Sequence, residues 1–237
     1  MLLDTKGQLI ERVHESSPGE YVGVAFSSLS DTLLLFTTRY DNKEHADDIF
    51  FAPVNINIAD FNKRKVIKQI ESICPRVYFE MVESPWSPDE KHFVYSVSDK
   101  RKMKTEGEKE KIRFMPENGI YIYSIVRDEH KRITDNGHYA VWSPKGNYIA
   151  YLIEDEIWLY NLSDSVSTRL YKPELYERVK DIHWTPDGEY LFVTCPKYHH
   201  HQNMLYSYNE KLLNVPDGKP VNFQKIDKGL CWYTWKK

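Results

Sequence analysis

The chain has 237 residues, of which 41% are hydrophobic and 28% charged, and its formal net charge is −3 at pH 7. With this net charge the chain lacks the overall positive charge that attracts nucleic acid or an anionic membrane. No apolar run approaches the roughly 20 residues that a transmembrane helix needs. The aromatic share of 14% favours strands over helices as the main element. We therefore expect an all-β protein with no nucleic-acid partner and no membrane insertion.

The amino-terminal segment "MLLDTKGQLIERVH", residues 1–14, is typical of two short strands joined by a turn at Lys6 and Gly7. It has an acid at position 4 and lacks the apolar core of a signal peptide. We expect a cytoplasmic location for the chain as written. A periplasmic or exported location is the alternative if a signal peptide has been removed.

The next segment, "AFSSLSDTLLLFT" from Ala25, is the first of four related stretches. The other three are "PWSPDEKHFVYSV" from Pro85, "VWSPKGNYIAYLI" from Val141 and "HWTPDGEYLFVTC" from His183. The aromatic anchors Phe26, Trp86, Trp142 and Trp184 follow one another at intervals of 60, 56 and 42 residues. A recurrence of about 40 to 50 residues is typical of a propeller or another repeat array.

Each repeat has a physical logic. The large aromatic side chain buries apolar area between adjacent sheets, and the proline that follows fixes φ for a turn. Asp or Gly then completes the turn, and a nearly continuous apolar run follows, as expected for a strand covered on both faces. Further strands follow in the same order, for example "EIWLYNL" and then "STRLY" after the third copy.

These four-strand units predict a β-propeller of four-stranded antiparallel blades at residues 21–70, 77–134, 138–171 and 179–226. The strands of a blade are called A to D in chain order. One segment, "NIADFNKRKVIKQI", is ambiguous between strand and helix, and "KPELYERVKDI" after Tyr171 could form a helical turn or two. Neither segment alters the all-β prediction.

The pattern W-S-P-D-G-x-x-I-A-Y, followed by two further strands, resembles the TolB-like, WD-repeat-like propeller repeats. Such repeats also occur in the propeller domains of prolyl-oligopeptidase-type and tricorn-type proteases. This chain departs from the pattern in three places: the first copy lacks Trp and Pro, Glu90 replaces the turn glycine, and Lys145 replaces the Asp. The motif is structural, so the resemblance implies a fold and not a chemistry.

The carboxyl-terminal stretch "KGLCWYTW" resembles a strand A that ends at an aromatic residue. We expect residues 228–237 to join residues 1–14 in a fifth blade, which would close the ring and cover its open edges. On this interpretation residues 1–237 form one domain and the protein is a monomer. A fragment of a longer propeller is the alternative.

In propellers the B–C and D–A connections emerge on one face, and here the B–C loops differ from one another, so a site is expected among them. The candidate binding residues on this face are Tyr40, His45, Asp47, Lys102, His138, Tyr198, His199 and His201. The weaker catalytic candidates are Asp41, His45, Asp48, His138 and His199. A metal site at the three consecutive histidines His199, His200 and His201 is disfavoured, because adjacent residues in an extended segment point to opposite sides, so at most two of them, His199 and His201, could converge on one ion.

The three cysteines, Cys74, Cys195 and Cys231, form neither a CxxC pair nor a zinc-binding spacing, so we expect free thiols and no cofactor. The nucleophile motif G-x-S-x-G is absent from the sequence. We therefore favour a non-catalytic module that binds a protein or peptide through its loop-rich face. The alternative is a hydrolase or lyase that acts on a carbohydrate or similar ligand with acids and histidines at the channel mouth.

Overall fold

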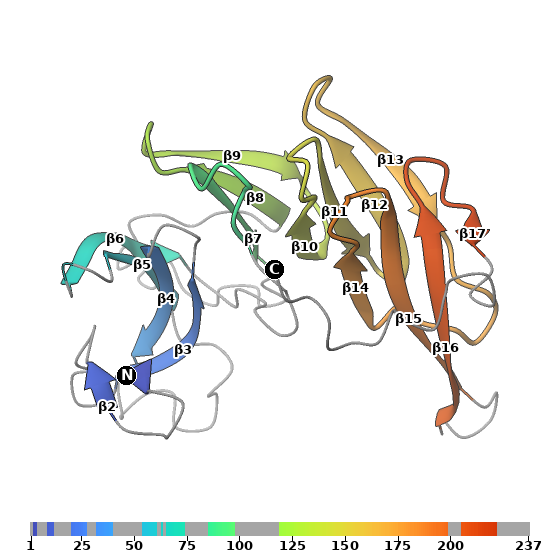
Figure 1. Ribbon diagram of the computed structural model, residues 1–237, viewed down its shortest axis with the longest axis horizontal. Helices are drawn as coiled ribbons and strands as arrows, with labels where there is room; N and C mark the ends of the chain where they lie inside the picture. Colours follow the sequence, from blue (N-terminus) through green and yellow to red (C-terminus); the bar gives the residue numbers. More distant parts are fainter. Residues whose placement is uncertain are drawn as a thin grey trace, which may run out of the picture. The chain divides into compact units, whose positions relative to one another are not determined.

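The computed structural model describes residues 2–3, 9–11, 20–27, 32–39, 54–60, 63, 65–73, 85–97, 119–198 and 205–221. Every regular element within these ranges is a β-strand, which confirms the all-β prediction (Figure 1). The chain divides into two compact units, unit 1 with residues 1–80 and 84–140 and unit 2 with residues 81–83 and 141–237. Within the described ranges no helix has the length and apolar character that crossing a membrane requires.

In unit 1 the strands follow one another as antiparallel neighbours in chain order. A two-stranded sheet contains β1 (Leu2–Leu3) and β2 (Leu9–Glu11). A four-stranded sheet contains β3 (Glu20–Ser27), β4 (Thr32–Arg39), β5 (Val54–Asp60) and β6 (Lys65–Ile73). A three-stranded sheet contains β7 (His92–Val97), β8 (Gly119–Ser124) and β9 (Glu129–Thr134), and a bridge between Trp86 and Phe93 marks the position of its strand A.

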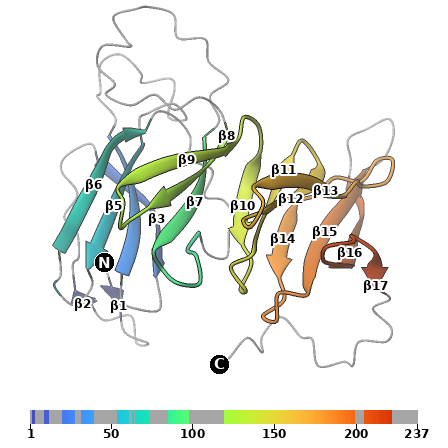
Figure 2. The ribbon, with the colours of Figure 1, turned by 90° about the horizontal axis from the view of Figure 1, so that it is seen from above.

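Two further four-stranded sheets have the same simple order (Figure 2). The first contains β10 (His138–Trp142), β11 (Tyr148–Ile153), β12 (Glu156–Asn161) and β13 (Val166–Tyr171). The second contains β14 (Asp181–Trp184), β15 (Tyr190–Tyr198), β16 (Leu205–Asn214) and β17 (Pro220–Val221). Both sheets have the four antiparallel strands that the repeats predict for a blade.

The structure assigns the two segments for which the sequence left helix open. "NIADFNKRKVIKQI" belongs to β5 and β6, which pair from Asp60 and Lys65 outward. Residues 172–180 form no helix and contain a single short turn. The fifth blade remains a prediction, because its carboxyl-terminal part, residues 228–237, lies outside the described residues.

The three clear A–B turns share one hydrogen-bond arrangement. In each, a hydroxyl accepts the backbone N–H five residues ahead: Ser87 from His92 at 3.0 Å, Ser143 from Tyr148 at 3.3 Å and Thr185 from Tyr190 at 3.0 Å. The same hydroxyl donates to a side-chain oxygen within the turn: to Asp89 at 2.6 Å, to Asn147 at 2.7 Å and to Asp187 at 2.6 Å. The Ser or Thr of the motif therefore closes the turn together with its carboxylate or amide partner.

This arrangement explains both departures of the clear copies. Where Lys145 replaces the aspartate, the amide oxygen of Asn147 takes the place of the carboxylate. Where Glu90 replaces the glycine, its φ is 56°, close to the 73° of Gly146 and the 66° of Gly188. The turn thus keeps its left-handed backbone without a glycine, at a cost in strain.

The tryptophan anchors Trp86, Trp142 and Trp184 are buried packing residues, as predicted. Trp184 is buried, and its indole N–H donates to the carbonyl oxygen of Val141 at 3.3 Å, which ties β14 to β10. The buried ring of Trp86 packs edge-on against Phe93 with 6.1 Å between the ring centres. These contacts position the strands whose far ends carry the loops.

Candidate functional site

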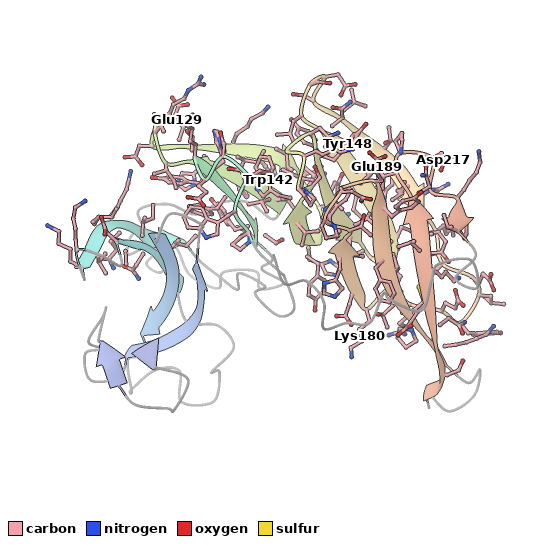
Figure 3. The ribbon with its side chains drawn as sticks, in the orientation of Figure 1. Glu129, Trp142, Tyr148, Lys180, Glu189 and Asp217 are labelled. Carbon is pink, nitrogen blue, oxygen red and sulfur yellow. The ribbon has the colours of Figure 1, made fainter. Side chains whose placement is uncertain are left out.

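The antiparallel order gives each sheet two different ends. The A–B and C–D connections lie at one end, here called the turn end, and the B–C and D–A connections lie at the other, here called the loop end. Figure 3 shows Lys180, just before β14, at the opposite end of unit 2 from Glu189 and Asp217, which belong to an A–B and a C–D turn. His138 and Tyr198, the two predicted site residues within the described ranges, lie at loop ends.

Two of the predicted site residues fall within the described ranges. His138 is the first residue of β10 and is half-buried, with its ring 4.9 Å from that of Tyr139. Tyr198 is the last residue of β15, and its backbone pairs with Leu205. The remaining candidates lie outside the described residues: Tyr40, Asp41, His45, Asp47, Asp48, Lys102, His199 and His201.

The described part of unit 2 contains a polar cluster at its loop end that the sequence did not predict. Its centre is Glu177, in the connection of residues 172–180 between β13 and β14. The Glu177 side chain is only 1% exposed, and the Lys211 side chain, on β16, is 16% exposed. Lys211 Nζ donates to Glu177 Oε2 at 2.7 Å, and the Asn209 amide donates to Glu177 Oε1 at 2.6 Å. The Glu174 backbone N–H adds a longer bond of 3.3 Å to Oε2.

Tyr171, at the end of β13, completes the cluster from the preceding sheet. Lys211 Nζ lies 2.5 Å from the Tyr171 hydroxyl oxygen and 5.2 Å from the centre of its ring. The ammonium group therefore bridges two neighbouring sheets, with a carboxylate and a phenol as partners.

Electrostatics fix the protonation of the central pair. Burial alone would raise the pKa of Glu177, but the hydrogen bonds from Lys211 and Asn209 hold it below its ordinary value. Burial alone would lower the pKa of Lys211, but its bonds to Glu177 and Tyr171 hold it well above its ordinary value. Both groups are thus charged at neutral pH, and neither is poised to exchange a proton there.

Cys195, on β15, is a free and fully buried thiol close to this cluster. Burial raises the pKa of this thiol to about 11. Because the reactive form of cysteine is the thiolate, Cys195 is not set up as a nucleophile. The cluster therefore acts as an anchor that holds the connection of residues 172–180 against β16.

The anchored connection displays apolar side chains to solvent. Leu175 is 75% exposed and Tyr176 is 39% exposed, immediately before the buried Glu177. Residues 172–180 contain this pair between charged neighbours, so the sequence indicated only a solvated connection. The one sequence signal of the anchor is Lys211, a charged residue that directly precedes the buried Leu212 and Leu213.

A second lysine–carboxylate–tyrosine cluster lies at a turn end in unit 1. Lys68, on β6, lies 2.5 Å from Asp128 Oδ1, and the Tyr123 hydroxyl donates to the same oxygen at 2.5 Å. The side chains of Lys68 and Asp128 are 30% and 66% exposed. Among the described residues there is no group of three or more His, Cys, Asp or Glu side chains that could hold a metal ion.

Comparison with known proteins supports the sequence-based resemblance. Residues 87–195, less than half of the chain, match the family model for the dipeptidyl peptidase IV N-terminal region. A putative TolB from Agrobacterium tumefaciens is 15% identical, with a TM-score of 0.50 over 85% of this chain and 80% of that one. No curated protein matches the chain at a significant level.

Two larger proteins contain a similar structure. The β-propeller domain of Cps50 (Swd1) from Myceliophteria thermophila is 13% identical, with a TM-score of 0.52 over 85% of this chain and 54% of that one. An oligogalacturonate lyase in complex with manganese is 9% identical, with a TM-score of 0.57 over 88% of this chain and 55% of that one. The fold is a TolB-like β-propeller fold. The chain spans about four fifths of the TolB structure but only about half of the other two.

Proposed function

We propose that this TolB-like propeller is a non-catalytic binding module whose loop ends recognise a protein or peptide. The observation that carries the proposal is the anchor at Glu177. Its buried charges are fully paired and hold a long connection in place, while Leu175 and Tyr176 face solvent. Such an arrangement supports recognition, because fixing a loop before binding lowers the entropy cost of association.

The electrostatics of the described loop end also support binding over catalysis. Glu177 and Lys211 are locked as an ion pair, and burial keeps the Cys195 thiol protonated at neutral pH. General acid–base catalysis works best with a pKa near the operating pH, and nucleophilic cysteine chemistry needs a thiolate. These groups have neither property.

Site-directed photo-crosslinking tests the proposal. A photoreactive residue is introduced in the full chain at Asp135 or Asp155, both at loop ends, and in separate variants at Asp164 or Lys219, both at turn ends. We expect a discrete protein adduct from the loop-end positions in cells of the source organism and none from the turn-end controls. Equal labelling from both ends would overturn the proposal.

The second candidate is a hydrolase or lyase acting on a carbohydrate, favoured by the structural likeness to an oligogalacturonate lyase. Its candidate residues are Asp41, His45, Asp48, His138 and His199. Turnover on a panel of oligosaccharides that includes oligogalacturonates, abolished by Asp41→Asn or Asp48→Asn, would replace the binding module with this enzyme. We expect no turnover.

A further inference from the structure

The β15–β16 hairpin extends further at the loop end than the corresponding hairpin of the preceding sheet. Strands β11 and β12 pair at six residue positions, whereas β15 and β16 pair at nine. Strand β14 pairs with β15 only as far as Thr194. The part of the hairpin past this residue, residues 195–198 and 205–209, is called the arm. In Figure 1 the beginning of β16 lies well past the beginning of β14, so the arm projects past strand A of its own sheet.

The connection of residues 172–180 lies beside the arm, in the place that strand A leaves open. Three described backbone contacts attach it to β15: the Lys180 N–H to the Thr194 carbonyl oxygen at 2.9 Å, the Arg178 N–H to the Pro196 carbonyl oxygen at 3.1 Å, and a bridge between Glu177 and Lys197. From Glu177 to Asp181 the chain advances four residues, while the facing strand advances three, from Lys197 to Thr194. The connection is therefore an irregular continuation of β14 with one extra residue, as in a β-bulge.

The Glu177 side chain reaches across β15 to the next strand. It accepts hydrogen bonds from Asn209 and Lys211 of β16, which are two residues apart and therefore lie on one face of the sheet. Asn209 pairs directly with Cys195 of β15, so the Cys195 side chain lies on that same face, where it is fully buried. The Glu177 carboxylate therefore lies on the face that carries this thiol and helps to shield it from solvent.

The attachment of the connection is mainly polar, whereas the body of the sheet is apolar. Within residues 172–180, all of which the structure describes, Val179 is the one buried apolar side chain. In the body of the sheet Leu191, Val193 and Leu213 have no exposed area. Burying an ion pair removes the hydration of both charges, so a buried pair stabilises the folded state much less than its short distance suggests. Segments with few buried apolar contacts open locally at a lower free energy than the whole protein unfolds.

We propose that residues 172–180 form a conformational latch on the arm, with Glu177 as its catch. In the closed state Glu177 ties the connection to β16 and shields the Cys195 thiol. In the open state the bonds from the connection to β15 and β16 are broken, Glu177 and Lys211 are hydrated, and Cys195 is accessible. The apolar body of the sheet stays folded in both states.

The latch bears on recognition through the arm. The β15 strand of the arm ends at Tyr198, one of the predicted binding residues. The closed latch braces the arm and so holds Tyr198 in one place, whereas the open latch releases it. This link to recognition rests on the proposed function; the latch itself rests on contacts within the chain.

Labelling of Cys195 with iodoacetamide in the full chain tests the latch. The rate is measured at a series of urea concentrations below the unfolding transition, and the peptide that contains Cys195 is quantified by mass spectrometry. Local opening exposes little surface, so its free energy depends little on urea, whereas the free energy of global unfolding falls steeply. We expect a labelling rate that is constant at low urea. A rate that follows global unfolding down to zero urea overturns the latch.

Two variants weaken the catch, and a third is the matched control. Asn209→Ala removes one hydrogen bond to the carboxylate and should raise the labelling rate at low urea by about tenfold. Lys211→Met should raise it further, and Asn209→Ala keeps the test informative if Lys211→Met does not fold. Lys145→Met removes the exposed pair with Glu189 at a turn end of the same unit and should leave the rate unchanged. Equal rates in all three variants contradict the latch.

Hydrogen exchange shows which segment moves. In Asn209→Ala the amides of Arg178 and Lys180 should exchange faster by the same factor as Cys195 is labelled, while the amide of Val193 keeps its protection. Faster labelling without faster exchange at Arg178 and Lys180 means that another motion exposes the thiol, and this result also overturns the latch. Both measurements use the chain without a partner. Their failure leaves the loop-end proposal standing, and a failed crosslinking experiment leaves the latch standing.

Discussion

A lysine, a carboxylate and a tyrosine meet twice in the part of the chain that the structure describes, in two different settings. At a turn end in unit 1, Lys68 and Asp128 are 30% and 66% exposed; at the loop end of unit 2, Lys211 and Glu177 are 16% and 1% exposed. The lysine nitrogen lies 5.4 Å from the Tyr123 ring centre in the first cluster and 5.2 Å from the Tyr171 ring centre in the second. The chemistry is nearly the same, and the burial is not.

The difference in burial decides what each cluster contributes. Water screens an exposed ion pair, so such a pair adds little to stability. Removing one member of a buried pair leaves a charge without water or a partner, which is strongly destabilising. The unit 1 cluster can therefore be lost with little consequence, whereas the unit 2 cluster fixes the connection that carries Leu175 and Tyr176.

The largest predicted effect is a loss of stability on removal of Lys211, which is compared with removal of Lys68. Lys211→Met should lower the free energy of unfolding by about 3 to 5 kcal/mol, because Glu177 stays buried without its cation. Lys68→Met should leave it nearly unchanged, since Asp128 is exposed to water. Urea unfolding followed by tryptophan fluorescence measures both variants.

A second substitution serves as the control for this pair. Adding Glu177→Gln to Lys211→Met removes the stranded charge and should recover a large part of the lost stability. If Lys211→Met and Lys68→Met cost the same, burial is not what distinguishes the two clusters.

The second prediction concerns whether other turn ends tolerate substitution as well as the turn end near Lys68. Gly188 and Gly218 both have left-handed backbones, with φ of 66° and 69°. A Cβ on Gly188 would meet the flexible Lys145 side chain at 3.2 Å, whereas one on Gly218 would overlap the Leu170 carbonyl oxygen. Gly218→Ala should therefore cost about 1 to 3 kcal/mol more than Gly188→Ala, because backbone must move. Equal melting temperatures for the two variants would contradict this close approach.

A smaller effect, of opposite sign, is expected at the turn of unit 1 that lacks its glycine. Glu90→Gly should raise the free energy of unfolding by about 1 kcal/mol, since it relieves the strain of a φ of 56°. Lys91→Gly, at the neighbouring exposed position, should bring no such gain. Chemical unfolding of both variants provides the measurement, and a destabilised Glu90→Gly would show that the Glu90 side chain contributes more than the strain costs.

The smallest predicted effect is a pH dependence of stability that comes from His130, beside the unit 1 cluster. Burial lowers the pKa of His130; Asp128 opposes this shift and Lys68 reinforces it. The folded protein therefore favours the neutral ring, whose Nδ1 lies 2.7 Å from the Tyr95 hydroxyl oxygen. Because the folded pKa lies below the ordinary 6.5, this stability is present above pH 6.5 and is lost as the pH falls through the folded pKa.

Comparison with His130→Gln isolates this contribution. The melting temperature of the unaltered chain should decline more steeply than that of the variant as the pH falls below 6.5. Parallel curves would rule out a role for His130. The Glu177 cluster should respond only at more acidic pH, because the pKa of that carboxyl lies below its ordinary value of 4.5.

The sequence predicted the strands well because the repeats encode them locally. Trp, Pro and the turn residues lie within a few positions of the strands they define, so the packing role of Trp184 follows from its motif alone. The anchor could not be found in this way. Glu177 and Lys211 are 34 residues apart, and they meet only because a connection folds back onto β16. Site loops do not repeat, so the pattern that reveals the strands says nothing about them.

The hydroxyl-centred turns also bear on how the chain folds. Their bonds span five residues, for example from the Tyr190 N–H to Thr185, so each A–B hairpin can close without help from another sheet. The bond from Trp184 to Val141 spans 43 residues and must form after its strands exist. We therefore expect several independent folding nuclei along the chain, one at each of the turns of Ser87, Ser143 and Thr185, with the seams between sheets consolidating afterwards.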